Sequence, residues 1–328
     1  MRRLMAAGLA ALAAIAAMQS ASAQTTLRFG KIPSTVNNVG SLYLHVAERK
    51  GFFAREGIKL ESVMIEGGTD RMVAAVDDGK VDLAHSSTPY LISAVLKGSN
   101  AVGIAGEVGN PVYTLIVRPE IKSYDDLRGK VIALSVAADT ISITTRKLLA
   151  KHGVKDGEFK VRQLVGTPVR FACLKSGECA GVPLGQPGDI AAVQAGFRRL
   201  GDTTEAVGNF QFQLIVAHRA WAAANRDKVV PFVRAVADAF RFIRDPANRT
   251  ETIKLMMEQT GSSEEIARAV MTLYFEPDRG VMPRQAEIDL KGLAQVIAFM
   301  GEAGELAAPL PAVERFVDLQ FLKAAGLQ

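Results

Sequence analysis

The sequence has few of the residues that usually carry nucleophilic catalysis or metal binding. It contains two cysteines, Cys173 and Cys179, and four histidines. None of these stands in an H-E-x-x-H, G-x-S-x-G or Walker-type arrangement. The glycine-containing segment GEVGNPV (106–112) matches no nucleotide-binding fingerprint. We therefore predict no catalytic residue, no metal site and no cofactor.

Runs of like charge are also missing. The pI is near 9.2, but Lys and Arg are scattered and never form a block of five or six residues. Without Arg2 and Arg3 the net charge falls from +5 to +3. A basic patch is what identifies most nucleic-acid-binding domains, so nucleic acid is not an expected partner.

Long apolar runs are absent except at the N-terminus. Arg2 and Arg3 precede an apolar run from Leu4 to Met18, and Ala21-Ser22-Ala23 follows it. This pattern is typical of a secretory signal peptide over residues 1–23, cleaved near Ala23. The run is too short to span a bilayer comfortably. We expect an exported, periplasmic protein.

Export makes a disulfide between Cys173 and Cys179 chemically feasible. The alternative is a pair of small buried thiols. The spacing of the two residues does not decide between them.

The remaining sequence alternates apolar runs with amphipathic segments up to about residue 219, which is typical of an α/β protein. We divide it into a first lobe (24–112), a second lobe (113–219) and a helical region (220–328) that returns mainly to the first lobe. YTLIVRP (113–119) and FQLIVAHR (212–219) are similar apolar strands, and we expect them to pair near the crossover between the lobes.

A repeat supports two similar lobes. Shifted by 98 positions, residues 68–98 fall on residues 166–196 with nine identities. The shared residues include Gly68 with Gly166, Thr69 with Thr167, and Pro89 with Pro187. A period of this length is too long for a solenoid and fits two copies of one supersecondary unit.

Ligands of open α/β sheets bind beyond the carboxyl ends of the strands. Six loops at such positions are rich in Gly, hydroxyl and amide residues, so their backbone N–H groups can bind a polar or anionic ligand. For single residues, helix capping is the simpler interpretation. The loops are residues 33–38, 67–70, 86–89, 136–140, 166–168 and 185–189.

Four segments resemble the nitrate/sulfonate/taurine family of solute-binding proteins and the related thiamine-pyrimidine-precursor proteins. They are RKGFFAREGIKLE (49–61), GGTDRMVAAVDDGKVDLAHSS (67–87), IKSYDDLRGKVIALS (121–135) and CLKSGECAGVPLGQP (173–187). The resemblance implies a two-lobed periplasmic binding protein fold of type II. It also implies capture of a small organic solute (sulfonate, carboxylate or pyrimidine-like) for an ABC importer, with the inner-membrane permease as partner. We expect a monomer.

The resemblance also implies a ligand site. Carried over position by position, the family's ligand loops fall on Ser34, Thr35, Asn38, Gly68, Thr69, Ser86, Ser87, Thr88, Ala138, Asp139, Thr140, Gly185 and Gln186.

Asp139 lies where sulfonate and nitrate binders commonly have a Gly/Ser-rich loop. This departure bears on the ligand, because a buried, unpaired carboxylate would repel an anion. If Asp139 only caps the following helix, an organic anion remains a suitable ligand. If it points into the cleft, a ligand with a donor group or positive charge is favoured.

Two other functions fit the same pattern. One is an enzyme of thiamine-pyrimidine precursor synthesis, although the cysteine-rich motif expected for it is missing. The other is a ligand sensor that acts on a membrane kinase.

Overall fold

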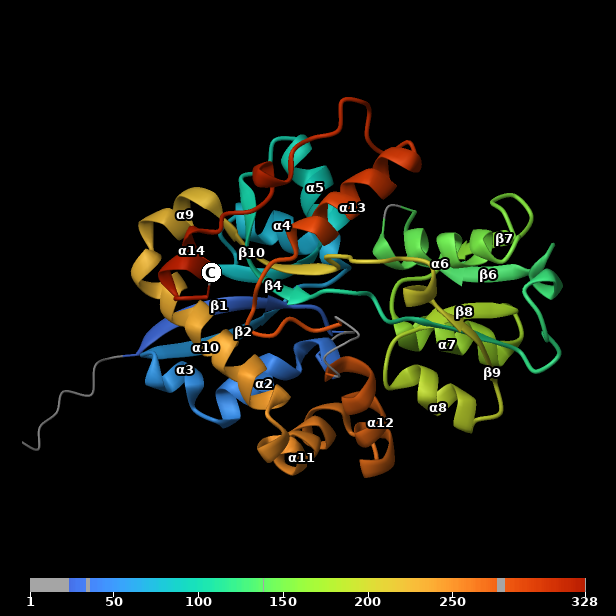
Figure 1. Ribbon diagram of the computed structural model, residues 1–328, viewed down its shortest axis with the longest axis horizontal. Coiled ribbons are helices and arrows are strands. Elements are labelled where there is room, and N and C mark those ends of the chain that lie inside the picture. The colour runs from blue at the N-terminus through green and yellow to red at the C-terminus, as the bar shows by residue number, and fades with distance from the viewer. Residues whose placement is uncertain (1–23, 34–35, 138, 276–280, 328) are drawn as a thin grey trace, which may run out of the picture.

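The chain folds into two lobes, each built on its own five-stranded sheet (Figure 1). The computed structural model describes residues 24–33, 36–137, 139–275 and 281–327. Among these residues, no helix is both long and apolar enough to cross a membrane.

The sheet of the first lobe has the strand order β2-β1-β3-β10-β4. Its strands are β1 (Thr25–Lys31), β2 (Ile58–Met64), β3 (Leu83–Ser87), β4 (Ala101–Val108) and β10 (Gln213–His218). Its helices are α2 (Leu42–Arg49), α3 (Phe52–Arg55), α4 (Thr69–Asp77) and α5 (Thr88–Leu96). β1 is parallel to β2 and β3, whereas β10 is antiparallel to β3 and β4.

The sheet of the second lobe repeats this plan in the order β7-β6-β8-β5-β9. Its strands are β5 (Thr114–Val117), β6 (Val131–Leu134), β7 (Lys160–Gln163), β8 (Gly181–Leu184) and β9 (Arg198–Asp202). Its helices are α6 (Thr140–Lys151), α7 (Thr167–Ser176) and α8 (Gly188–Gln194). β5 is antiparallel to β8 and β9. The 98-residue repeat is confirmed at this level, since α4-β3-α5 and α7-β8-α8 are the same unit.

The expected pairing of the two similar strands is wrong. β5 lies in the second sheet and β10 in the first. They resemble each other because each is the antiparallel fourth strand of its own sheet. It follows that residues 213–218, which the sequence division places in the second lobe, pair with β3 and β4 of the first lobe.

Two crossing segments connect the lobes: residues 109–113 between β4 and β5, and residues 203–212 between β9 and β10. Backbone hydrogen bonds join them at both ends. Thr203 N donates to Tyr113 O (2.9 Å), and Phe212 N donates to Val108 O at the end of β4 (3.0 Å). The crossing segments therefore form a narrow double connection, the usual arrangement for a hinge between rigid lobes.

The C-terminal region is helical and packs on the first lobe. Its helices are α9 (Arg219–Ala224), α10 (Arg226–Arg244), α11 (Arg249–Thr260), α12 (Glu264–Phe275), α13 (Leu290–Glu302) and α14 (Gln320–Ala324). Phe232 of α10 stacks between Phe29 and Phe53, and Phe240 stacks on Tyr43 with ring centroids 4.9 Å apart. These contacts belong to one hydrophobic core shared with the first sheet.

Two stretches of the region expected to be helical, 220–328, are not continuous helix. α13 begins only at Leu290, where Asp289 Oδ1 accepts a capping hydrogen bond from Gly292 N. Residues 313–326 form a 3₁₀ turn and the short α14, because Val317 bridges to Gly103 of β4.

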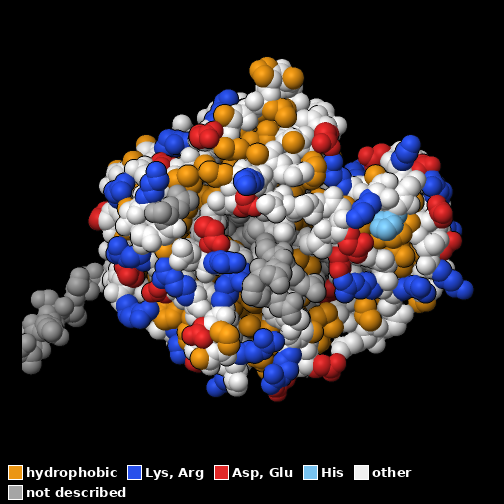
Figure 2. Space-filling view, viewed as in Figure 1, with side chains coloured by type: hydrophobic (Ala, Val, Ile, Leu, Met, Phe, Trp, Pro, Cys, Tyr) orange, Lys and Arg blue, Asp and Glu red, His pale blue; other side chains and the backbone are white. Residues whose placement is uncertain are grey.

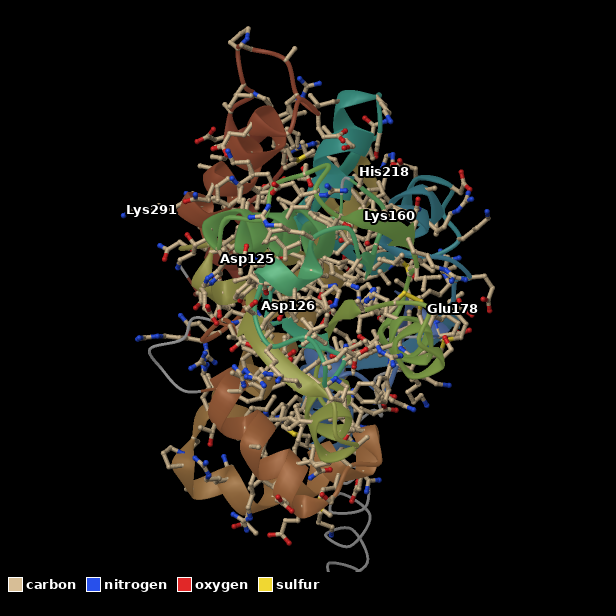
Figure 3. All side chains as sticks on the ribbon, turned by 90° about the vertical axis from the view of Figure 1, so that its right-hand side faces the viewer. Asp125, Asp126, Lys160, Glu178, His218 and Lys291 are labelled. Carbon is tan, nitrogen blue, oxygen red and sulfur yellow. A yellow bond between two sulfur atoms is a disulfide. The ribbon has the colours of Figure 1, made fainter. Side chains whose placement is uncertain are left out.

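The two cysteines form a disulfide that links α7 to the segment before β8 (Figure 3). Cys173 and Cys179 are both buried in the core of the second lobe. The bridge thus closes a short local loop next to β8, the strand that ends at Leu184.

The surface carries mixed charge. On the face shown in Figure 2, Lys and Arg alternate with Asp and Glu over both lobes. This agrees with the scattered charges of the sequence.

Candidate functional site

A cavity of about 100 Å³ lies between the two lobes. A buried water needs roughly 10 to 15 Å³ on the same measure, so the space suits a small solute. The residues lining the cavity come from both lobes and from the crossing segments. They are Ile32, Asn38, Gly68, Thr69, Ser87, Tyr90, Tyr113, Ser135, Val136, Asp139, Ile141, Val165, Gly166, Thr167, Arg170, Phe212 and Gln213.

The wall from the first lobe is polar. Thr69 begins α4 and Ser87 ends β3, so both stand where a strand end or helix N-terminus opens on the cleft. Asn38 precedes a 3₁₀ turn, where its Oδ1 accepts from Gly40 N (2.9 Å). These residues offer hydroxyl and amide groups rather than charge.

Ser87 also reaches the second lobe. Its Oγ lies 3.1 Å from Oγ1 of Thr140, the first residue of α6. Both side chains are buried. This hydrogen bond joins the lobes at the cavity and indicates that they are closed.

Arg170 is the cation of the site. It lies on α7, its side chain is only 1 % exposed, and it lines the cavity. Its Nε donates to Pro183 O (2.7 Å) and one terminal nitrogen to Leu164 O (3.3 Å). Burial lowers the pKa of Arg170, while the nearby Tyr113 and Asp139 act in the opposite direction.

No carboxylate of the described residues forms an ion pair with Arg170. Buried charges in proteins are normally paired, because leaving water is expensive for an ion. The guanidinium group is therefore ready to bind an anionic group in the cavity.

Asp139 is the anion of the site. It takes the N-cap position of α6, but its side chain makes no capping hydrogen bond of normal geometry. Instead it is buried and lines the cavity. Burial raises its pKa, while a hydrogen bond from Ser135, the charge of Arg170 and the backbone N–H groups of Ile141 and Thr140 act against the rise. The carboxyl group of Asp139 thus lies at the N-terminus of α6 and at the cavity wall at the same time.

Two aromatic residues of the crossing segments complete the wall. The rings of Tyr113 and Phe212 meet edge to face with centroids 5.9 Å apart. Burial raises the pKa of Tyr113 well above its ordinary value, so its phenol stays protonated. Because each ring sits on a crossing segment, movement of the hinge would change the cavity directly.

The candidate residues from the sequence divide into three groups. Asn38, Gly68, Thr69, Ser87 and Asp139 line the cavity. Ser34, Thr35 and Ala138 lie outside the described residues.

The third group lies near the cavity without lining it: Ser86, Thr88, Thr140, Gly185 and Gln186. Thr88 Oγ1 donates to Phe212 O (3.2 Å), and Ser86 Oγ donates to Ser87 O (3.1 Å). Both hydroxyls are thereby used to hold the backbone.

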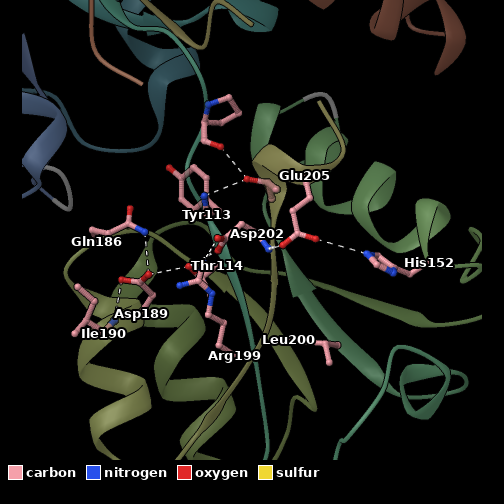
Figure 4. A network of polar contacts seen from close by, with 12 residues as sticks. Tyr113, Thr114, His152, Gln186, Asp189, Ile190, Arg199, Leu200, Asp202 and Glu205 are labelled. Atoms are coloured by element: carbon pink, nitrogen blue, oxygen red, sulfur yellow. Dashed lines mark hydrogen bonds and ion pairs between the residues drawn. The ribbon is translucent and has the colours of Figure 1, made fainter. Parts of the chain in front are cut away.

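Gln186 belongs to a polar network behind the cavity (Figure 4). Its Nε2 donates to Asp189 Oδ2 (2.9 Å), which also accepts from Thr114 Oγ1 (2.8 Å). The Tyr274 hydroxyl of α12 donates to Gln186 Oε1 (2.9 Å). Gln186 therefore connects the second lobe to the C-terminal helices.

Arg170 is absent from the candidates named from the sequence, yet the repeat carries a signal for it. The shift of 98 positions places Arg170 on Met72, which is fully buried in the core of the first lobe. An arginine at a position where the first copy of the repeat has a buried apolar residue indicates a functional position.

Comparison with protein families gives a match over residues 38–248 to the model described as "NMT1/THI5 like". A relative named "Putative binding protein YtlA", from Bacillus subtilis (strain 168), is 22 % identical over 308 residues, which cover 90 % of this chain and 89 % of that protein.

Two solved structures share the fold. The zinc-bound ligand-binding component of an ABC-type import system from Staphylococcus aureus has a TM-score of 0.77 at 15 % identity, covering 93 % of this chain and 100 % of that one. The periplasmic aliphatic sulphonate binding protein SsuA from Escherichia coli has a TM-score of 0.68 at 18 % identity, covering 89 % and 92 %. These neighbours establish the periplasmic binding protein fold.

Proposed function

The chain belongs to the NMT1/THI5-like family, and from this premise we propose that it is the extracytoplasmic ligand-binding component of an ABC importer. Its two lobes close on a small organic solute and present it to a permease in the membrane. The import-system and sulphonate-binding neighbours support this role. The signal peptide over residues 1–23 and the monomeric state remain predictions.

We further propose the chemical class of the solute: an acid that also carries an amine or another hydrogen-bond donor. The observation that carries this proposal is the presence of buried Arg170 and buried Asp139 in one cavity without an ion pair between them. A simple anion would satisfy Arg170 but meet repulsion from Asp139. A donor group facing Asp139 removes that conflict.

We propose no enzymatic step. The binding-protein relatives support a non-catalytic role. Among the described residues no group of three or more His, Cys, Asp or Glu side chains could hold a metal ion.

A ligand panel tests the proposal. It contains sulfonates, carboxylates, amino acids and aminopyrimidines, measured by thermal shift and by small-angle scattering, alongside native mass spectrometry of the protein as purified. We expect acids that bear an amine to raise the melting temperature and to compact the protein. Absence of both effects across the panel would refute the binding role.

Arg170→Met tests the assignment of the acidic group. Truncating one partner of a buried charge pair costs about 2 to 5 kcal/mol, so the affinity should fall at least about 30-fold. Arg234→Met is the control, because Arg234 pairs with Glu56 away from the cavity. An unchanged affinity of a folded Arg170→Met protein contradicts the proposed ligand class.

A further inference from the structure

A second, smaller cavity adjoins the first. It measures about 50 Å³ and shares Asn38, Tyr113, Phe212 and Gln213 with the main cavity. Its other walls are Gly40, Ser41, His85, Val108, Val112, Gly185 and Tyr274. The space accommodates a few water-sized groups, which is enough for the polar end of a solute.

His85 is the residue of this cavity whose hydrogen bonding is incomplete. The side chain lies in β3, is buried, and forms part of the cavity wall. Its Nε2 has no hydrogen-bond partner among the described residues. Buried polar atoms are almost always paired, so a lone imidazole nitrogen at a cavity wall calls for a partner that enters the cavity.

The other side of the ring faces a carboxylate. His85 Nδ1 lies 3.5 Å from Glu107 Oε1, and the same oxygen accepts from the Tyr43 hydroxyl (3.1 Å). Both Glu107 and Tyr43 are buried. The hydrogen bond made by one ring nitrogen determines which nitrogen carries the proton. The acceptor beside Nδ1 favours the tautomer with its proton on that nitrogen, which leaves a lone pair on Nε2.

We propose that the second cavity is a ligand subsite in which His85 Nε2 accepts a hydrogen bond from an N–H or O–H group of the solute. This inference rests on the proposed function, with Arg170 and Asp139 holding the acid and the amine in the main cavity. Glu107 and Tyr43 act as positioning residues that orient the ring. The solute is thus longer than its charged head and has a second polar group.

Paired probes test the subsite. Hydroxyl-terminated α-amino acids of three to six carbons (serine, homoserine, 5-hydroxynorvaline, 6-hydroxynorleucine) are titrated calorimetrically against their unsubstituted analogues. At the length that spans the two cavities, we expect the hydroxyl form to bind about threefold to tenfold more tightly, the value of one hydrogen bond. His85→Phe should abolish this preference, so that each hydroxyl form binds no more tightly than its unsubstituted analogue.

His45→Phe is the matched control. His45 lies on α2, lines neither cavity, and faces Glu258 at 3.7 Å. Its replacement should leave the hydroxyl preference unchanged. Equal affinity within every pair in the wild type overturns the subsite alone. Failure of all eight probes to bind overturns the subsite together with the proposed ligand class.

The protonation of the His85 ring can also be measured in the wild-type protein without ligand. Nitrogen-15 NMR of the imidazole rings should show His85 with its proton on Nδ1 and an unprotonated Nε2. Glu107→Gln should disturb this state, whereas His45→Phe should not. A proton on Nε2 of the wild type overturns the proposed donor class.

Discussion

Asp139 is the residue at which ligand chemistry and protein stability meet. Burial raises its pKa above the ordinary 3.8, although Ser135 and Arg170 favour the charged form. For an acid whose pKa rises on folding, the stabilising contribution is complete at low pH and is lost as the pH rises through the folded-state pKa. Burial of the carboxyl group thus lowers the stability of the ligand-free protein at pH values above the ordinary pKa.

Asp139→Asn should therefore have opposite effects on stability and on binding. At pH 7 the ligand-free variant should unfold at a higher denaturant concentration than the wild type, and the difference should vanish below about pH 4. Its affinity for an amine-bearing acid should fall about tenfold or more, since a hydrogen bond to a charged group is lost. Denaturation curves at several pH values and calorimetry measure both. A variant less stable than the wild type at pH 7 contradicts this account.

At the residue scale the sequence places five of its candidates at the cavity wall but misses Arg170. Ser87 ends a strand, Thr69 begins a helix and Asn38 precedes a helical turn, and such positions are visible in a pattern of runs and loops. Arg170 sits in the first turns of a helix, where an arginine is usually exposed. Its burial depends on the carbonyl groups of Pro183 and Leu164, and contacts of this kind arise only when β7 and β8 are assembled.

At the scale of elements, the 98-residue repeat predicts the helix–strand–helix unit of each lobe, because both its helices and its strand have local periodicity. The location of β10 could not be predicted in the same way. Its sequence resembles β5, and similarity along the chain cannot separate strands that pair from strands that occupy equivalent places in two sheets. The sheet in which β10 lies is determined by the return of the chain to the first lobe through residues 203–212.

The repeat also supplies a test of the disulfide. Cys173 and Cys179 correspond to Ala75 and Val81 of the first copy, so Cys173→Ala combined with Cys179→Val introduces side chains that the same unit already holds. The bridge spans six positions, and loop-closure entropy for so short a loop gives roughly 2 kcal/mol of stability. We expect a loss of that size in denaturant unfolding, with ligand affinity unchanged within about twofold.

Reduction of the wild type should have the same effect as the double substitution. Alkylation followed by mass measurement should label both cysteines only after reductant is added. Labelling of the native protein without reductant, or a double variant as stable as the wild type, would show that the bridge does not stabilise the lobe.

At the scale of the whole molecule, hydrogen bonds and an ion pair between the lobes hold the closed arrangement. Ser87 meets Thr140 at the cavity. Tyr274 of α12 meets Gln186 on one side, and Lys147 of α6 meets Glu302 of α13 at an exposed rim on the other. The C-terminal helices pack on the first lobe, and α12 and α13 lie beside the second (Figure 1). We therefore expect these helices to take part in opening and closing.

The two outer contacts should differ in their effect on closure. Tyr274→Phe removes a buried hydrogen bond worth about 1 kcal/mol, which shifts the equilibrium toward the open form and lowers the apparent affinity about fivefold. Glu302→Gln removes only an exposed ion pair and should change the affinity less than about twofold.

Because Tyr274 also lines the second cavity, affinity alone does not separate an effect on closure from an effect on ligand contact. Small-angle scattering of the ligand-free proteins does so: the radius of gyration should increase for Tyr274→Phe and stay at the wild-type value for Glu302→Gln. An increase of equal size in both variants would mean that the buried contact has no special part in holding the lobes together.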